Sequence, residues 1–427
     1  MRISTIQAFN TGVRGIQDNY SSVTRTQEQI STGKRMLTPA DDPVGSVRLL
    51  QLEQEAGKLT QYRENITAAT NSLNQQEAVL NTMNNILQRI REITLEAGNG
   101  ALEAGARQAM AQELAEREDE LYGLMNSRNA RGEYLFGGFQ SDTQPFVRHP
   151  DGSYSYEGDE GQRSIQVGSA KMVAMNDNGK ALFVDVANVN RVSTTSDLVV
   201  PAPNESRSAR ISLVVVENKA EFDQQFYPLA HAGIAATEHP RVRITEDGSG
   251  YVIEAGDPVE ELAAGTLGAT RDGSHEIRFA GVSFKLDGEL MEGDTFTLSV
   301  GTGEHSERRN VLDSIRLLRE TLQSGDDSPE GKLQRRDMLA VSLQNIDNAM
   351  NQVLGVQTSL GARLNVLDSA LLENDEASLI NTKVQSGLED LDYAEALSRL
   401  SMQSIVLQAA QQSFVKTSNL SLFNFLR

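Results

Sequence analysis

The sequence predicts an α+β protein, in which long N- and C-terminal coiled-coil helices form nested helical domains around a central antiparallel β insert. The first observation is the distribution of proline. Seven of the ten prolines lie between Pro145 and Pro258, and none follows Pro329. The second is glycine, because 17 of the 34 glycines fall in residues 142–304. A proline inside a helix costs ~3 kcal/mol, so the flanks favour long helices and the middle is rich in turns.

An apolar repeat with alternating steps of three and four residues runs through both flanks. In the first flank it extends from Ile6 to Ile30 and again from Leu59 to Ile90, and a less regular helix is expected from about Arg107 to Asn129. In the last flank it runs from Leu339 to Leu371 and from Leu388 to Phe414. A sustained period of 3.5 residues predicts a coiled coil. An ordinary antiparallel bundle would show the same spacing.

The first and last helices are expected to pair, because helices at both ends bracket a single β segment. The side chains predicted to form their seam and the apolar C-terminal tail, and therefore to make assembly contacts, are Ile6, Phe9, Val13, Ile16, Tyr20, Val23, Leu397, Leu400, Leu407, Phe414, Leu422, Phe423, Phe425 and Leu426. The tail is too apolar for all of it to face one helix, so part of it should contact neighbouring subunits or a chaperone. Gln27, Gln76 and Gln357 occupy seam positions, where they either fix the register or are simply tolerated.

A short segment between the first two helices has the residues of a rigid connector. It contains Pro39, Asp41, Asp42 and Pro43. Asp42 is a good N-cap, and Pro43 is suited to the first helical position because it lacks the N–H that would go unpaired there. We therefore expect the next helix to begin at this pair.

The middle third has the pattern of antiparallel strands. Residues 241–244 and 251–253 flank a turn and predict a hairpin. A second set comprises residues 276–279, 282–286 and 295–298, and an earlier pair is expected from residues 154–156 with 164–167. Residues 142–304 also hold 26 acidic and 13 basic side chains, which predicts a solvated outer domain.

Several function classes find no support in the sequence. The chain has no cysteine and a formal charge of −20, which argues against thiolate metal sites and non-specific binding to nucleic acid. No apolar run approaches the ~18 residues of a membrane span, and the N-terminus lacks a secretory signal pattern. The five histidines show no metal-binding spacing, and no phosphate-binding loop is present. We therefore expect no catalytic residues, no cofactor, no metal, no nucleic-acid partner and no membrane insertion.

Both ends of the chain resemble the bacterial flagellin family. The resemblance rests on the Met1–Ser4 start, on Gln29–Arg35 with Pro39–Pro43, and on the end at Ser421–Arg427. Within the family, Gly132–Phe139 and Pro43 after the aspartate pair are most similar to the members that join the hook to the filament. The resemblance implies an inner helical domain (1–44 plus 386–427), a second helical coiled-coil domain (45–141 plus 305–385) and an outer β-rich domain (142–304).

The resemblance also implies a structural function at the hook–filament junction of the bacterial flagellum, supporting the assembly of flagellin. The implied partners are the other junction protein (hook-associated protein 1), flagellin, copies of the chain in a ring, an export chaperone and the type III export apparatus. The protein would be secreted and extracellular. One alternative is a flagellin, which polymerises with itself into a filament. Another is an adhesin or enzyme on a flagellin-like scaffold, which would need a site in residues 190–304.

Overall fold

A computed structural model describes residues 5–100, 102–199, 209–229, 238–245, 248–268, 274–300 and 305–425. The chain forms two compact units. Unit 1 comprises Met1–Thr67, Gln166–Lys171 and Asp368–Arg427, and unit 2 comprises Ala68–Ile165 and Met172–Leu367. Among the described residues, no helix is both long enough and apolar enough to cross a membrane.

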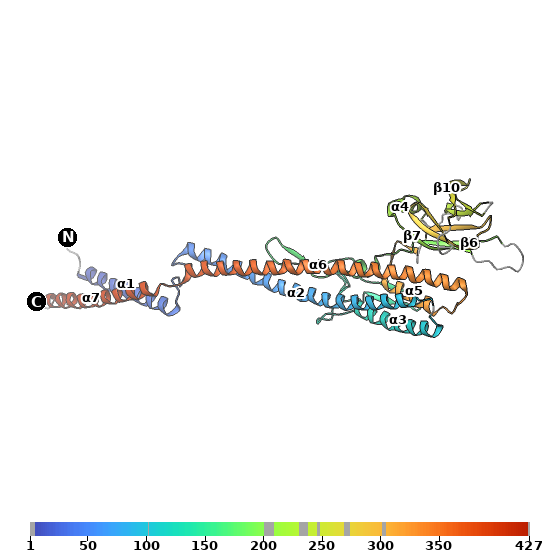
Figure 1. Ribbon diagram of the computed structural model, residues 1–427. Coiled ribbons are helices and arrows are strands. Elements are labelled where there is room, and N and C mark those ends of the chain that lie inside the picture. The colour runs from blue at the N-terminus through green and yellow to red at the C-terminus, as the bar shows by residue number, and fades with distance from the viewer. Residues whose placement is uncertain are drawn as a thin grey trace. The chain divides into compact units, whose positions relative to one another are not determined.

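Helices occupy both ends of the chain, as the proline distribution predicts (Figure 1). The α-helices are α1 (Thr5–Thr32), α2 (Pro43–Ala97), α3 (Ala104–Met125), α4 (Lys219–Phe226), α5 (Val311–Gln323), α6 (Pro329–Glu389) and α7 (Tyr393–Phe425). Two single turns, η1 (Lys180–Val184) and η2 (Tyr227–Leu229), interrupt the β region. The helices α4 and α5 were not predicted from the sequence, and α6 begins ten residues before the predicted repeat at Leu339.

Strands fill the middle of the chain. They are β1 (Phe146–Arg148), β2 (Tyr154–Tyr156), β3 (Ser164–Gln166), β4 (Met172–Ala174), β5 (Val186–Ala187), β6 (Val192–Asp197), β7 (Ala209–Val216), β8 (Arg241–Ile244), β9 (Gly250–Ala255), β10 (Glu260–Thr266), β11 (His275–Phe279), β12 (Val282–Gly288), β13 (Thr295–Val300) and β14 (Arg308–Arg309). The two larger sheets have the orders β10-β9-β8-β13-β6 and β11-β12-β7. The small sheets are β1-β2, β3-β4 and β5-β14. The long terminal helices and central antiparallel strands confirm the predicted fold class.

The seam positions of α2 are buried with the predicted period. Within α2 the buried positions include Leu52, Ile66, Ala69, Leu73, Gln76, Leu80, Met83, Leu87, Ile90, Thr94 and Ala97. The matching heptad positions of α6 that are buried are Leu339, Ile346, Val353, Leu360, Leu367, Asn374 and Asn381. Residues with alternating steps of three and four face one side of a helix, so these two helices present continuous seams.

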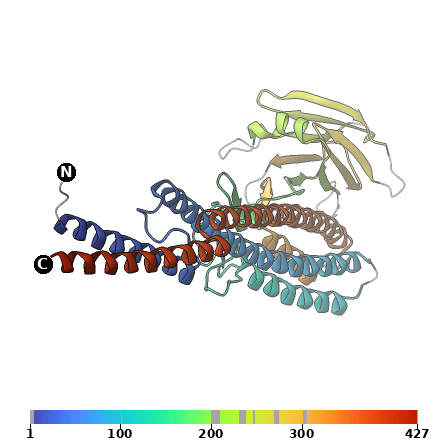
Figure 2. The same ribbon diagram turned by 90° about the vertical axis from the view of Figure 1, so that its left-hand side faces the viewer.

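Hydrogen bonds show that α2 and α6 run in opposite directions. In unit 2, Arg91 Nε donates to Asp347 at 2.6 Å, and Gln357 Nε2 donates to Asn81 at 2.8 Å. As the residue number rises along α2, it therefore falls along α6. In this unit α3 and α5 pack against each other beside the pair (Figures 1 and 2). The long helices of unit 2 therefore pack as an antiparallel bundle, one of the two arrangements that the spacing left open.

The two larger sheets enclose one apolar core. Its buried residues come from both sheets and from α4: Val192, Ala209, Ile211, Val214, Phe222, Phe226, Val242, Ile244, Ile253, Ile277, Val282, Phe284, Leu286, Phe296 and Leu298. Alternate residues of β8 and β12 point into this core, as expected for strands with one buried face. The predicted hairpins β8–β9 and β11–β12 are present.

Two predicted strand pairings are wrong. Residues 154–156 pair with β1, and 164–166 pair with β4, so the two segments do not pair with each other. Residues 295–298 do not continue the sheet of β11 and β12; β13 instead lies between β6 and β8 in the other sheet. The strands β1, β4 and β6 were not predicted, and the pairing of β13 with the predicted strand β8 was missed, because pairing is decided by packing between distant segments.

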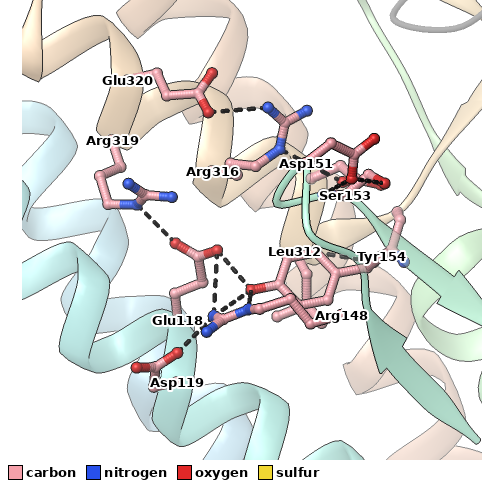
Figure 3. A network of polar contacts seen from close by, with 12 residues as sticks. Glu118, Asp119, Arg148, Asp151, Ser153, Tyr154, Leu312, Arg316, Arg319 and Glu320 are labelled. Atoms are coloured by element: carbon pink, nitrogen blue, oxygen red, sulfur yellow. Dashed lines mark hydrogen bonds and ion pairs between the residues drawn. The ribbon is translucent and has the colours of Figure 1, made fainter.

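A buried carboxylate joins the β1–β2 hairpin to α3 and α5 (Figure 3). Glu118 is only 2% exposed. It accepts hydrogen bonds from the Tyr154 hydroxyl at 2.7 Å and from Arg319 Nε at 2.9 Å. Arg148, whose Nε donates to the Tyr154 hydroxyl at 2.7 Å, completes the network. Burial raises the pKa of the Tyr154 hydroxyl, so it remains protonated and able to donate to Glu118.

Replacing Glu118 by Ala should lower the free energy of unfolding of unit 2 by about 3–5 kcal/mol, because it leaves the largely buried Arg319 without its carboxylate. Urea unfolding followed by circular dichroism measures the change. The matched control is Glu120→Ala, whose carboxylate pairs with Arg117 on the exposed side of α3 and should contribute less than ~1 kcal/mol. Equal losses in the two variants would contradict the anchoring role.

Candidate assembly surfaces

The helices α1 and α7 pair in opposite directions, as their apolar repeats predict (Figure 1). The rings of Phe9 and Phe414 lie 5.1 Å apart. Nearer the other end of α1, the buried Thr26 hydroxyl donates to Gln403 Oε1 at 2.7 Å. A Cβ atom on Gly12 would lie 2.9 Å from the Phe414 ring, so the absence of a side chain there allows the close approach.

This pair covers only part of the predicted seam. Its half-buried members are Val13, Ile16, Val23, Leu400, Leu407 and Phe414. Tyr20 and Leu397 are 63% and 52% exposed, and Phe9 is 48% exposed. The expectation that Tyr20 and Leu397 are covered within this pair is therefore wrong, because two helices bury only one strip of each other's surface.

The structure does not place every predicted assembly side chain. Those that lie outside the described part of the chain are the side chains of Ile6, Leu422, Phe423, Phe425 and Leu426. Their roles in assembly stay predictions.

The helix α7 has a second apolar stripe, which was not predicted from the sequence. Met402 and Ile405 are 64% and 62% exposed, and Val406 and Val415 are also largely uncovered. A helix that is apolar on more than one face is normally buried on more than one face. The spacing of three and four residues from Met402 to Ile405 and Val406 indicates this second stripe in the sequence. It was not recognised because the stripe with Leu400 and Leu407 runs through the same segment. The single chain therefore leaves much of α7 available for a partner.

The connector is held by its two aspartates. Asp41 Oδ2 accepts the backbone N–H groups of Leu37 at 2.9 Å and Thr38 at 3.1 Å, and Asp41 also pairs with Arg25. Asp42 Oδ1 accepts the N–H of Gly45 at 2.9 Å, directly before α2 begins at Pro43. Asp42 is thus the N-cap of α2, in the geometry that satisfies an otherwise unpaired N–H group.

The same segment is bound to the break between α6 and α7. Arg35 N donates to the Glu389 carbonyl at 2.7 Å, and Leu391 N donates to the Gly33 carbonyl at 2.9 Å. Gly33 has a φ of 71°, which favours glycine. Lys34 pairs with the Glu389 carboxylate, and this hydrogen bond raises the pKa of Lys34. The connector therefore links the end of α1 to the end of α6.

Polar side chains occupy the seam of α2 and α6 in unit 1. Asn374 and Asn381 are 7% and 5% exposed. Their Nδ2 atoms each donate at 2.9 Å to an α2 carbonyl, those of Leu59 and Leu52 respectively. Each Oδ1 is buried without a hydrogen-bond partner among the described residues. These amides specify one register between the helices, because a shift would leave the Nδ2 groups unpaired as well.

The outer faces of the same segment are apolar. On α2 the exposed side chains include Val44, Val47 and Leu50, and on α6 they include Leu372, Leu379, Ile380 and Val384. Leu372 and Leu379, for example, are 72% and 69% exposed. Large apolar areas of this kind mark interaction sites.

The glutamines at predicted seam positions have different surroundings. Gln27 is exposed, so it does not lie in a seam. Gln76 is buried and donates to the Met175 carbonyl at 3.3 Å, whereas Gln357 donates to Asn81 across the pair. A register role for Gln76 and Gln357 stays a prediction.

Replacing Asp41 by Ala should loosen the connector, because at least two backbone N–H groups lose their acceptor. Trypsin cleavage after Lys34 and Arg35 measures the opening, and we expect it to be about tenfold faster. Asp18→Ala removes the same charge from an exposed position of α1 and is the control. Unchanged cleavage in the Asp41 variant would show that the connector is held by other contacts.

Replacing Asn374 and Asn381 together by Leu should raise the thermal midpoint of unfolding by about 2–4 °C, because two buried oxygens without partners are removed. Differential scanning calorimetry measures this shift. Asn71→Leu, on an exposed position of α2, controls for the higher helix propensity of leucine. A lower midpoint in the double variant would mean that the two amides contribute net stability.

Comparison with known proteins agrees with this architecture. The model of the bacterial flagellin N-terminal helical region matches residues 3–141, and that of the C-terminal helical region matches residues 343–426. Together they cover just over half of the chain. Both matches fall on the flanks and leave out the two larger sheets.

Full-length relatives are similar from end to end. Flagellar hook-associated protein 3 of Salmonella typhimurium is 24% identical over 427 residues, covering 100% of both chains. Polar flagellin B/D of Vibrio parahaemolyticus is 22% identical and covers 96% of this chain and 94% of its own. The crystal structure of hook-associated protein 3 from Legionella pneumophila has 25% identity and a TM-score of 0.62, covering 79% of this chain and 98% of its own. The chain therefore belongs to the bacterial flagellin family, and within it to the hook-associated protein 3 group.

Proposed function

We propose that this chain is the adaptor that joins the hook to the filament in the bacterial flagellum and supports flagellin assembly. The proposal rests on the apolar side chains that a single chain leaves exposed. They lie on α1, on α7 and on the unit 1 parts of α2 and α6. Exposed apolar helix faces of this extent require partners. The end-to-end similarity to hook-associated protein 3 identifies the kind of assembly.

A flagellin is the alternative, and its subunits would polymerise without limit. The relatives named hook-associated protein 3 match over the whole chain in sequence. The solved structure of hook-associated protein 3 from Legionella pneumophila shares its fold. These similarities favour the junction over the filament. Incubating the purified chain under conditions that polymerise flagellin distinguishes the two, because an adaptor stops short of filaments. Long filaments of the pure chain, seen by electron microscopy, would favour the flagellin alternative.

The partners follow from this position. The chain would bind hook-associated protein 1 on the hook side, flagellin on the filament side and its own copies in a ring. Before assembly it would be carried by an export chaperone to the type III export apparatus, and it would act outside the cell. The absence of cysteine from the sequence supports this route, since no disulfide has to be opened before the chain is unfolded for export.

The proposed division into domains assigns residues 1–44 and 386–427 to an inner domain, 45–141 and 305–385 to a second domain, and 142–304 to an outer domain. The connector of Pro39, Asp41, Asp42 and Pro43 would hold the first two together. The hydrogen bond that Asp42 accepts from the N–H of Gly45, the first residue of the second domain, supports this. The relatives are structural flagellar proteins, and we propose that this chain likewise has no enzymatic activity.

Replacing Leu397 and Ile405 by Gln should leave the free chain folded, because both side chains are more than half exposed and Gln is a good helix former. The variant should nevertheless fail to restore motility in a strain lacking the gene, and flagellin should appear in the medium. Val259→Gln, at an exposed position outside the helices, is the control and should restore motility. Normal motility in the α7 double variant, at equal levels of protein, would contradict an assembly role for this face.

A further inference from the structure

A turn at residues 136–141 holds one phenylalanine inside unit 2 and presents another on its surface. Phe136 is fully buried, with its ring 5.4 Å from that of Phe183, whereas Phe139 is 63% exposed. The turn closes the Gly132–Phe139 segment, on which the resemblance to the junction proteins rests. It belongs to unit 2, whereas the assembly surfaces described above belong to unit 1.

The backbone of this turn has a conformation that favours glycine at two positions. Gly138 has a φ of 70°, and a Cβ atom there would clash with Asp159. A Cβ atom on Gly137 would lie 2.6 Å from the carbonyl oxygen of Gln140. Glycine adopts a positive φ and a close approach of this kind without strain. The two glycines therefore allow the tight turn that places Phe139 outside.

Side chains from two distant segments hold the turn in this conformation. Asp159 Oδ1 accepts the N–H groups of Phe139 at 2.8 Å and of Gly161 at 2.6 Å. The hydrogen bond from Phe139 lowers the pKa of Asp159, which therefore stays ionised. The buried Asn176 Nδ2 donates to the Gly138 carbonyl at 3.1 Å. Because the backbone is ordered before any partner binds, little conformational entropy is lost on binding.

The ring of Phe139 is held in place while most of its surface stays exposed. It rests on the backbone of Gly161, where a Cβ atom would overlap the ring. Rigid aromatic side chains are enriched at the centres of protein interfaces, where they fill pockets on the partner. The turn therefore has the properties of a preformed interface anchor.

The border of the exposed ring is acidic. The two segments that form the turn, residues 131–142 and 157–163, hold five carboxylates against two arginines. Glu133 is paired with Arg163 at 3.6 Å, and Glu160 is paired with Lys180. Of the remaining carboxylates, that of Asp142 is exposed beside the turn. An acidic border favours a partner whose own contact surface carries lysine or arginine.

We propose that Phe139 docks into an apolar socket on a neighbouring subunit of a different protein at the junction, and that lysine or arginine side chains border this socket. The inference rests on the proposed function, which supplies such neighbours. A second copy of this chain is a less favourable occupant, because it brings the same acidic border and a formal charge of −20. The contact adds unit 2 to the assembly surfaces of unit 1.

Photo-cross-linking from position 139 tests the proposal. The full-length chain, with p-benzoylphenylalanine in place of Phe139, is produced in a strain lacking the gene, and its isolated flagella are irradiated. We expect a cross-linked product between the chain and a different flagellar protein. The matched control is the same replacement of Tyr227, which is also 63% exposed but lies in η2, and it should give far less product.

The outcomes separate this inference from the proposed function. Absence of the chain from the isolated flagella would contradict the junction function, and the docking with it. Flagella that contain the chain but give no product from position 139, products with its own copies only, or equal yields from positions 139 and 227 would overturn the docking alone.

Phe139→Ala measures the strength of the contact. Because the ring is largely exposed, the thermal midpoint of unfolding should stay within about 2 °C of the native value. Filaments on cells with this variant should be shed under shear about tenfold faster, since loss of an aromatic anchor mainly speeds dissociation. Asp142→Asn should speed shedding about threefold at low ionic strength, the effect of one exposed charge, and it remains informative even if the Phe139 variant is destabilised. Tyr227→Ala should shed filaments at the native rate, and native shedding by the Phe139 variant would overturn the proposal.

Discussion

The antiparallel seam between α2 and α6 is the constraint on which the helical part depends. Its apolar residues recur with a period of 3.5, so both helices can keep one face in contact over many turns. In unit 1 the antiparallel arrangement brings the start of α2 and the end of α6 to the same place. The connector can therefore donate to the Glu389 carbonyl and accept from Leu391. These hydrogen bonds hold the end of α1 next to the start of α7, so the two helices can pair although they are far apart in sequence.

The buried side chains of the same seam are of different kinds in the two units. In unit 2 the buried heptad positions of α6, such as Val353 and Leu360, are apolar, whereas in unit 1 they are Asn374 and Asn381. In unit 1 several large apolar side chains of α2 and α6, such as Leu50, Leu372 and Leu379, are exposed on the outer faces. The single chain thus has a well-buried bundle in one unit and a helix pair with uncovered apolar faces in the other. This division suits a protein that must remain folded alone and still add to an assembly.

Features that depend on local periodicity could be predicted from the sequence, and those that depend on distant partners could not. The heptads placed the long helices, and Asp42 with Pro43 located the start of α2. The partners of β2 and β13 were missed because strand pairing is set by non-local packing. The helix α4 was missed although Asn218 and Glu221 have capping-box spacing.

The Glu118 network could not be predicted from the sequence, because the residues that donate hydrogen bonds to Glu118, Tyr154 and Arg319, lie 36 and 201 residues away. Exposure of Tyr20 and Leu397 follows from the width of a two-helix contact, which the sequence alone does not reveal.

The central claim is that the uncovered apolar faces of unit 1 are buried between subunits at the junction. Electron cryo-microscopy of isolated hook–filament junctions containing this chain tests that claim most directly. The account predicts that Tyr20, Leu397 and Ile405 lose most of their exposed surface to neighbouring subunits. A junction in which these side chains remain in contact with solvent would contradict it.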